Sequence, residues 1–250
     1  MQDNAPTGKR LVDLTWPEVA ALVRPVLVVP TGSCEQHGPH LPFDTDTRIA
    51  VATADAVVAR LDARSMGGSA GEIPATATMV VAPPLAVGAS GEHDGFPGTL
   101  SIGTDAFANS VIELVRSADA FVGVIVINGH GGNVDALRTA SAQSIADGRR
   151  VEVLHCSLPG GEPHAGVGET SVMLHLHPDA VRMDLAEAGE LRPWSEIGDI
   201  AVRDGFAALA PNGVLGDPRP ATADRGMIWF EELVERIGGR IAEVLQQWGT

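Results

Sequence analysis

Short apolar runs rich in β-branched residues recur along this chain, and they constrain its fold more than any other feature. Residues 121–127 (FVGVIVI) form the clearest of them. Apolar side chains at successive positions are typical of short strands that are buried on both faces. The runs cover residues 26–30, 78–82, 121–127 and 151–155.

Helical periodicity separates these runs. Near the N-terminus, Thr15, Pro17 and Glu18 form a capping-box pattern that predicts a short helix, and Thr104 is expected to cap a later one. Strands that alternate with helices predict an α/β fold, a single three-layer domain over residues 1–250 with a mostly parallel sheet flanked by helices. The expected longer helices are 47–64, 105–118, 133–147, 169–176 and 223–248.

The charge of the chain excludes several classes of partner. Seventeen Lys and Arg residues against 32 Asp and Glu give a formal charge of −15. Such a surface repels phosphate backbones and anionic lipid, so we expect no nucleic-acid or membrane partner. The longest apolar run, 120–127, is too short to span a bilayer, and the first ten residues lack the apolar core of a signal peptide. Cys34 and Cys156 show no pairing pattern, so we expect a cytoplasmic protein with free thiols.

Polar side chains follow several of the predicted strands. Glu35 and His37 come after the first strand, with Asp46 at the end of the same loop, and His130 follows the 121–127 strand. Glu169 lies beyond the last strand, after a further loop. Because parallel sheets place their sites outside the carboxyl ends of the strands, we expect these residues to converge. Residues i and i+2 of an extended segment point to one side, so Glu35 and His37 can reach one centre.

The residue types in this set predict a metal centre. Three carboxylates and two imidazoles without a thiolate suit Zn²⁺, Fe²⁺ or Mn²⁺. Five protein ligands exceed what one catalytic zinc takes, so we expect two divalent ions with a bridging carboxylate. Spacing alone leaves alternatives open, because a loop carboxylate and a His also arise by chance. NGHGGN could be a simple strand–helix turn, or Asn128 and Asn133 could orient metal ligands.

Four segments of the chain stand out: GSCEQHGPHLPFDTD, SGEHDGFPGTLSIG, VINGHGGN and HAGVGETS. Together they resemble the creatininase (creatinine amidohydrolase) family. The similarity runs from about residue 11 to residue 176, with a weaker match at 216–226. It implies a parallel α/β fold, a two-metal centre, hydrolysis of amide-type C–N bonds and a homo-oligomer. It also implies that Glu35, Asp46 and His130 hold one ion, that His37, Asp46 and a further Glu hold the other, and that Asp46 bridges them.

The chain departs from the namesake enzyme of that family at two places. Creatininase carries a liganding Glu two residues after the His of NGH, where this chain has Gly132. Glu169 is the expected replacement, either as a metal ligand or as a catalytic group only. All four tryptophans lie outside the 156–168 loop, where creatininase closes its pocket with tryptophan. Creatinine is therefore not the expected substrate.

Further residues of the motifs have expected roles. In the family, the position of His164 acts on the substrate or shuttles a proton, and an imidazole suits protonation of a leaving amine. His40 and His93 are expected either to line the pocket or to shape its loops or a subunit contact. Glu92 is expected either to bind an amine of the substrate or to accept hydrogen bonds from backbone amides.

The sequences of these motifs are most similar to those of the mycofactocin-system branch of the family. That resemblance implies a peptidase that releases the modified C-terminal Val-Tyr-derived unit from a small precursor peptide. One alternative is an amidohydrolase of a small cyclic amide or formamide. Another, from a different class, is a non-catalytic metal-binding scaffold for a peptide-maturation complex, although an open two-metal centre has no purpose in a scaffold.

Overall fold

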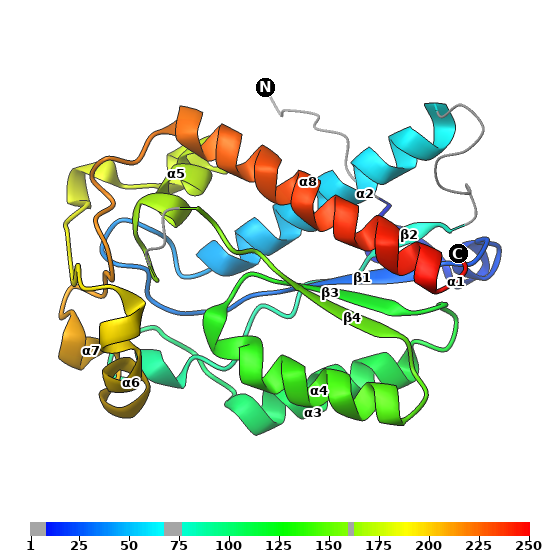
Figure 1. Cartoon of the computed structure of the whole chain (residues 1–250), viewed down its shortest axis with the longest axis horizontal. Coiled ribbons are helices and arrows are strands. Elements are labelled where there is room, and N and C mark those ends of the chain that lie inside the picture. The colour runs from blue at the N-terminus through cyan, green and yellow to red at the C-terminus, as the bar shows by residue number, and fades with distance from the viewer. Residues whose placement is uncertain (1–8, 68–76, 160–162) are drawn as a thin grey trace.

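The centre of the molecule is a four-stranded parallel sheet. The structure is a computed structural model that describes residues 9–67, 77–159 and 163–250, so much of the segment used for the signal-peptide prediction lies outside it. The strand order is β2-β1-β3-β4, and every neighbouring pair is parallel. This arrangement confirms the α/β fold (Figure 1). The strands are β1 (Val26–Thr31), β2 (Met79–Val81), β3 (Val124–Asn128) and β4 (Val151–His155).

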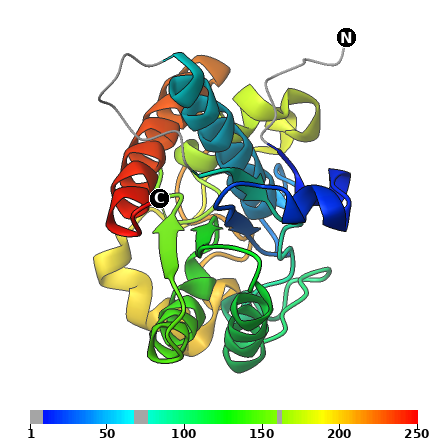
Figure 2. The same cartoon turned by 90° about the vertical axis from the view of Figure 1, so that its right-hand side faces the viewer.

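Helices cover both faces of the sheet and make the three layers (Figures 1 and 2). Side chains alternate along β1, so Val26 and Val28 join one apolar core while Leu27 and Val29 join the other. Both faces are therefore buried, which explains why the strand sequences are continuously apolar. One layer contains α2 (Thr45–Gly67), α5 (Val167–Leu176) and α8 (Ala223–Gln247), and the other contains α3 (Thr104–Ser117) and α4 (Val134–Ala146).

Two local predictions need correction. Thr104 does not cap α3 but is its first residue, because the preceding Gly103 takes the N-cap position with a φ of 79°. The third strand begins at Val124 rather than at Phe121, since the Phe121 amide donates to the carbonyl of Ala118 and closes a turn. The N-terminal helix α1 (Trp16–Ala20) was predicted correctly, and Thr15 and Glu18 form its capping box.

The region before α8 contains two helices that the sequence pattern did not predict. These are α6 (Trp194–Asp204) and α7 (Phe206–Leu209), which surround a small core of their own. In Figure 1 they lie at the left, beyond the ends of the strands. No helix in the described part of the chain is long and apolar enough to cross a membrane. Short 3-10 turns complete the structure at Leu11–Asp13, Gly91–His93, Gly131–Asn133, Pro178–Ala180 and Met183–Leu185.

Candidate metal centre

The predicted site residues meet at the carboxyl ends of the strands. Glu35 and His37 lie in the loop after β1, and Asp46 lies in the first turn of α2. His130 follows β3, and Glu169 lies in the first turn of α5. The side chains of Glu35, His37 and His130 are at most 4% exposed. The sheet topology therefore assembles one centre from four separate segments.

Asp46 joins two groups of three residues. Its Oδ1 lies 3.1 Å from His37 Nε2, and its Oδ2 lies 3.0 Å from His130 Nδ1. Glu35 Oε2 lies 3.1 Å from His130 Nε2, and Glu169 Oε2 lies 4.0 Å from His37 Nε2. In each group the ligand atoms lie within 4.8 Å of one another. The geometry therefore brings Glu35 and His130 to one side of Asp46, and His37 and Glu169 to the other.

The electrostatics of this centre favour a cation. Glu35 is fully buried, and its oxygens have no partner with hydrogen-bond geometry in the described part of the chain. Burial alone would lower the pKa of His37, but Asp46 outweighs it and raises that pKa to about 10. Glu35 and Asp46 likewise raise the pKa of His130 against the effect of burial. Because burying carboxylates without positive charge is costly, this nitrogen and oxygen donor set fits divalent metal ions.

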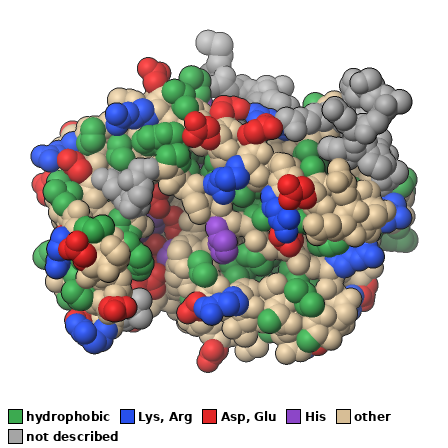
Figure 3. Space-filling model, in the orientation of Figure 1, with side chains coloured by type: hydrophobic (Ala, Val, Ile, Leu, Met, Phe, Trp, Pro, Cys, Tyr) green, Lys and Arg blue, Asp and Glu red, His purple; other side chains and the backbone are tan. Residues whose placement is uncertain are grey.

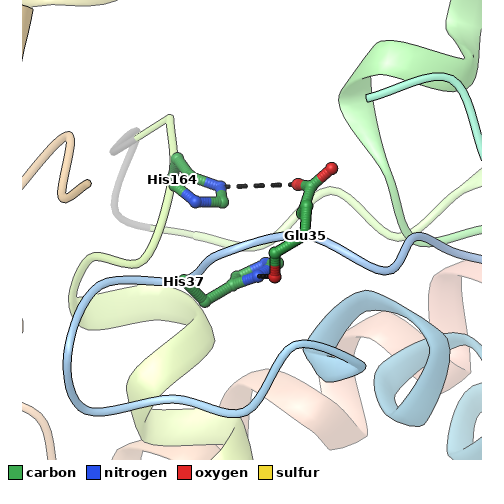
Figure 4. Close-up of side chains that lie close together, drawn as sticks. All are labelled: Glu35, His37 and His164. Carbon is green, nitrogen blue, oxygen red and sulfur yellow. Dashed lines mark hydrogen bonds and ion pairs between the residues drawn. The ribbon is translucent and has the colours of Figure 1, made fainter. Parts of the chain in front are cut away.

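His164 faces the centre and is held by the backbone. Its Nε2 lies 2.8 Å from the carbonyl oxygen of Gln36, which can only accept, so Nε2 carries the hydrogen. Its Nδ1 lies 3.9 Å from Glu35 Oε1, and Figure 4 shows these two side chains pointing toward each other. Burial holds the pKa of His164 well below its usual range, with repulsion from His37 adding to the effect. The imidazole is therefore neutral, with a free acceptor nitrogen.

Gln36 connects His164 to His93, because its backbone carbonyl accepts from His164 Nε2 and its side-chain amide reaches His93. Its Oε1 accepts from the amide of Gly38, so its Nε2 can donate to the carbonyl of Gly213 and to His93 Nδ1. The hydrogen of His93 then sits on Nε2, which lies 3.2 Å from Glu35 Oε1. Gln36 was not predicted as part of the site, because a glutamine between two candidate ligands carries no signal of its own.

Two asparagines and one histidine support the centre from outside. Asn128 donates to the carbonyl of His130, and Asn133 connects the carbonyl of Gly32 with the amide of Ala89. These bonds hold the loops after β1, β2 and β3 together. His40 forms a hydrogen bond with Thr170 Oγ1 at 2.9 Å. It is not among the described residues that line the cavity, whereas His93 and Glu92 are.

A cavity of about 760 Å³ opens onto the centre, which is a normal size for a small-molecule site. Its wall includes Trp194 and Phe206, which pack edge to face at 6.3 Å. Acidic and histidine side chains appear in a hollow of the molecular surface in Figure 3. The sequence did not reveal the aromatic wall, because Trp194 and Phe206 come from the helices that the pattern did not predict.

Comparison with known proteins agrees with this geometry. The chain matches the family described as "Creatininase: Creatinine amidohydrolase" over residues 12–241. It belongs to the creatininase family. A relative from Mycolicibacterium smegmatis, named mycofactocin precursor peptide peptidase, is 48% identical over 218 residues, covering 87% of this chain and 84% of the relative.

Solved creatininase structures share the fold. The structure named "Creatininase Mn" and a mutant creatininase described as Zn-Zn type each superpose with a TM-score of 0.73 at 25% identity. Each match covers 94% of this chain and 98% of the other. The creatininase family is thus metal-dependent, and the Glu, Asp and His groups described above are where this member can bind metal.

Proposed function

We propose that this creatininase-family chain is a two-metal peptidase. Its reaction is hydrolysis of an amide bond in the mycofactocin precursor peptide, which releases the modified C-terminal Val-Tyr-derived dipeptide. The high identity to the relative from Mycolicibacterium smegmatis supports this substrate. The main support for the two-metal chemistry is the position of Asp46 between the two groups. Its Oδ1 lies 3.1 Å from His37 Nε2, and its Oδ2 lies 3.0 Å from His130 Nδ1.

The proposed ligands follow from these groups. Glu35, Asp46 and His130 hold one divalent ion, and His37, Asp46 and Glu169 hold the other. His37 Nδ1 lies 3.2 Å from the carbonyl oxygen of Glu35, to which it can donate, and this leaves Nε2 free as the ligand atom. Zn²⁺, Fe²⁺ and Mn²⁺ all suit this set. Two such ions, when bound, supply Lewis acidity and lower the pKa of a water molecule.

His164 carries the proton in this proposal. Its free Nδ1 accepts a proton from the attacking water and then donates it to the departing amine nitrogen. The hydrogen bond from Nε2 to the carbonyl of Gln36 fixes the tautomer and the orientation of the ring. Glu169 then acts as a metal ligand, with 21% of its side chain exposed toward solvent.

The cavity supports an uncharged or amine-bearing group as the substrate part next to the metals. Its described lining includes the carboxylates Glu92 and Asp135 in addition to the proposed ligands, and it includes no Lys or Arg. A free carboxylate would meet repulsion from Glu92 and Asp135. Trp194 and Phe206 offer an apolar wall for an aromatic side chain.

The test is mass spectrometry of the modified precursor peptide after incubation with metal-loaded protein. The wild type should release a dipeptide-sized C-terminal fragment, and Asp46→Ala should release none. An intact peptide with confirmed metal content would instead favour an amidohydrolase of a small cyclic amide or formamide. A chain that binds metal and leaves each of these substrates intact would favour the metal-binding scaffold.

We also propose that the active form is a homo-oligomer. Leu100 and Ile102, in the loop between β2 and α3, are 58% and 44% exposed. Contact with a second subunit would remove this apolar surface from water. Sedimentation analysis tests the proposal, and a purely monomeric, fully active enzyme would contradict it.

A further inference from the structure

One buried carboxylate in the wall of the cavity is not used by the proposed metal centre. The acidic residues of the described lining are three of the proposed ligands together with Glu92 and Asp135. The side chain of Asp135 is 72% exposed and pairs with Arg138, so water and this guanidinium stabilise its charge. Only 22% of the Glu92 side chain is exposed. Glu92 is therefore the carboxylate of this wall whose charge needs an explanation.

The protein itself offers Glu92 little compensation. Its Oε1 lies 3.5 Å from Nε2 of His130, which is too long for a strong hydrogen bond. That nitrogen lies 3.0 Å from the carbonyl oxygen of Ala89, which can only accept, so its hydrogen already has a nearer acceptor. No Lys or Arg is present among the described residues of the cavity lining. A carboxylate placed this deeply is unfavourable unless a cation binds beside it.

Glu92 lies close to the histidine that protonates the leaving nitrogen in the proposed reaction. The 3-10 turn Gly91–His93 brings an oxygen of Glu92 within 4.8 Å of an oxygen of Glu35. His164 Nδ1 lies 3.9 Å from Oε1 of the same Glu35. A Cβ atom at position 132 would lie 2.3 Å from Glu92 Oε1, so Gly132 leaves room for this carboxylate at the cavity. A nitrogen that receives its proton from His164 is therefore released near Glu92.

Hydrolysis of an amide bond produces a cation that suits this position. Water adds its hydroxyl to the carbonyl carbon, the C–N bond breaks, and the nitrogen takes the remaining hydrogen and leaves as an amine. An α-amino group has an ordinary pKa of about 8, so at neutral pH the amine takes up a further proton and becomes an ammonium ion. We propose that Glu92 binds the ammonium group of the released fragment. The inference rests on the proposed function and identifies the part of the fragment that the enzyme recognises.

The test compares two small ligands that differ only in this amine. Val-Tyr amide carries the α-amino group, and 3-methylbutanoyl-tyrosine amide lacks it but keeps all the other heavy atoms. Calorimetry at neutral pH measures the affinity of each ligand for metal-loaded wild type, Glu92→Gln and Asp135→Asn. Asp135→Asn is the matched control, because it removes one charge from the same cavity. The wild type and Asp135→Asn should bind the amine at least about tenfold more tightly than the analogue, whereas Glu92→Gln should bind the two ligands alike.

Two more variants separate the charge of Glu92 from the shape of its side chain. Glu92→Ala removes the charge and should lose the preference for the amine, whereas Glu92→Asp keeps the charge and should retain a preference. Thermal unfolding and metal analysis check that each variant is folded and loaded. All variants should bind the analogue with wild-type affinity, because it has no ammonium group.

The outcomes for Glu92 and for the proposed function can be told apart. A preference of wild-type size in Glu92→Gln and Glu92→Ala, or its loss in Asp135→Asn, would overturn the assignment, because the amine would then bind elsewhere. A wild type that binds both ligands alike would overturn it as well. Cleavage of the precursor peptide is measured separately. An intact peptide together with Glu92-dependent binding of the amine would contradict the peptidase function and still support Glu92 as the amine-binding residue.

Discussion

Asp46 and His130 face each other across the centre, with 3.0 Å between Oδ2 and Nδ1. Asp46 lies in the first turn of α2 and His130 follows β3, so their contact depends on how this helix and this strand are placed. Burial would raise the pKa of Asp46, but His37 and His130 outweigh that effect and hold the pKa well below its usual range. The carboxylate therefore stays ionised and available to both proposed metal positions.

Replacement of this shared carboxylate should remove both ions. Asp46→Asn keeps the shape of the side chain but removes its charge, and we expect the affinity for each ion to fall by more than about 100-fold. Peptide hydrolysis should be lost with the metal. Metal analysis after dialysis measures the effect.

Asp44→Asn is the matched control for this prediction. Asp44 lies two residues away, with its side chain 47% exposed and paired with Arg48 at 2.7 Å. An exposed pair of this kind contributes little to stability. We therefore expect Asp44→Asn to keep both ions and full activity, and retention of both ions by Asp46→Asn would contradict the bridging role.

Two glycines of the same turn should respond differently to alanine. A Cβ on Gly129 would lie 2.3 Å from the backbone carbonyl oxygen of Asp46, whereas a Cβ on Gly131 would meet nothing within 4 Å. Gly129→Ala must push β3 and α2 apart at the metal centre, which should cost about 1–3 kcal/mol of unfolding free energy. Gly131→Ala should change the stability little.

Chemical denaturation and metal titration check the pair of glycine variants. Gly129→Ala should also bind metal more weakly, because the separation moves Asp46 away from His130. Equal stability of the two variants would show that the close approach of Gly129 to Asp46 does not hold in solution.

The sequence predicted the sheet and most of the centre because both depend on local signals. Continuous apolar runs such as 124–128 reveal buried strands, and the parallel topology then places His130 and Glu35 at one edge. Gln36 could not be assigned in this way. Its role depends on the path of distant loops that bring His93 and Gly213 to its side chain, which no short-range pattern encodes.

The aromatic wall of the cavity illustrates the same limit. Trp194 and Phe206 belong to α6 and α7, whose core consists of a few small and large apolar residues from short helices. Short elements of this kind carry weak periodicity, and their position depends on contact with the rest of the molecule. The sequence therefore predicted which residues converge at the centre better than it predicted the wall of the cavity.

Removal of the proposed proton carrier should separate chemistry from metal binding. His164→Gln keeps a donor for the carbonyl of Gln36 but cannot cycle a proton, so we expect kcat to fall by about 10²- to 10⁴-fold. Both ions should remain bound, because His164 is not among the proposed ligands. Steady-state kinetics with parallel metal analysis measures the two effects, and unchanged kcat would assign the proton transfer to another group.

The stability of the protein should depend on the ionisation of a histidine outside the centre. His155 ends β4, and its Nδ1 lies 3.1 Å from Asn128 Nδ2, so it accepts from that amide as a neutral ring. Burial lowers the pKa of His155 in the folded state below its usual value of about 6.5. Between the two pKa values the unfolded chain binds more protons than the folded one, so stability falls as the pH drops below about 6.5.

In His155→Gln this part of the pH dependence should disappear, while His175→Gln, a change at an exposed position on α5, should keep it. Denaturation curves from pH 7.5 to 5 measure the slope, and equal slopes for wild type and His155→Gln would show that His155 titrates alike in both states.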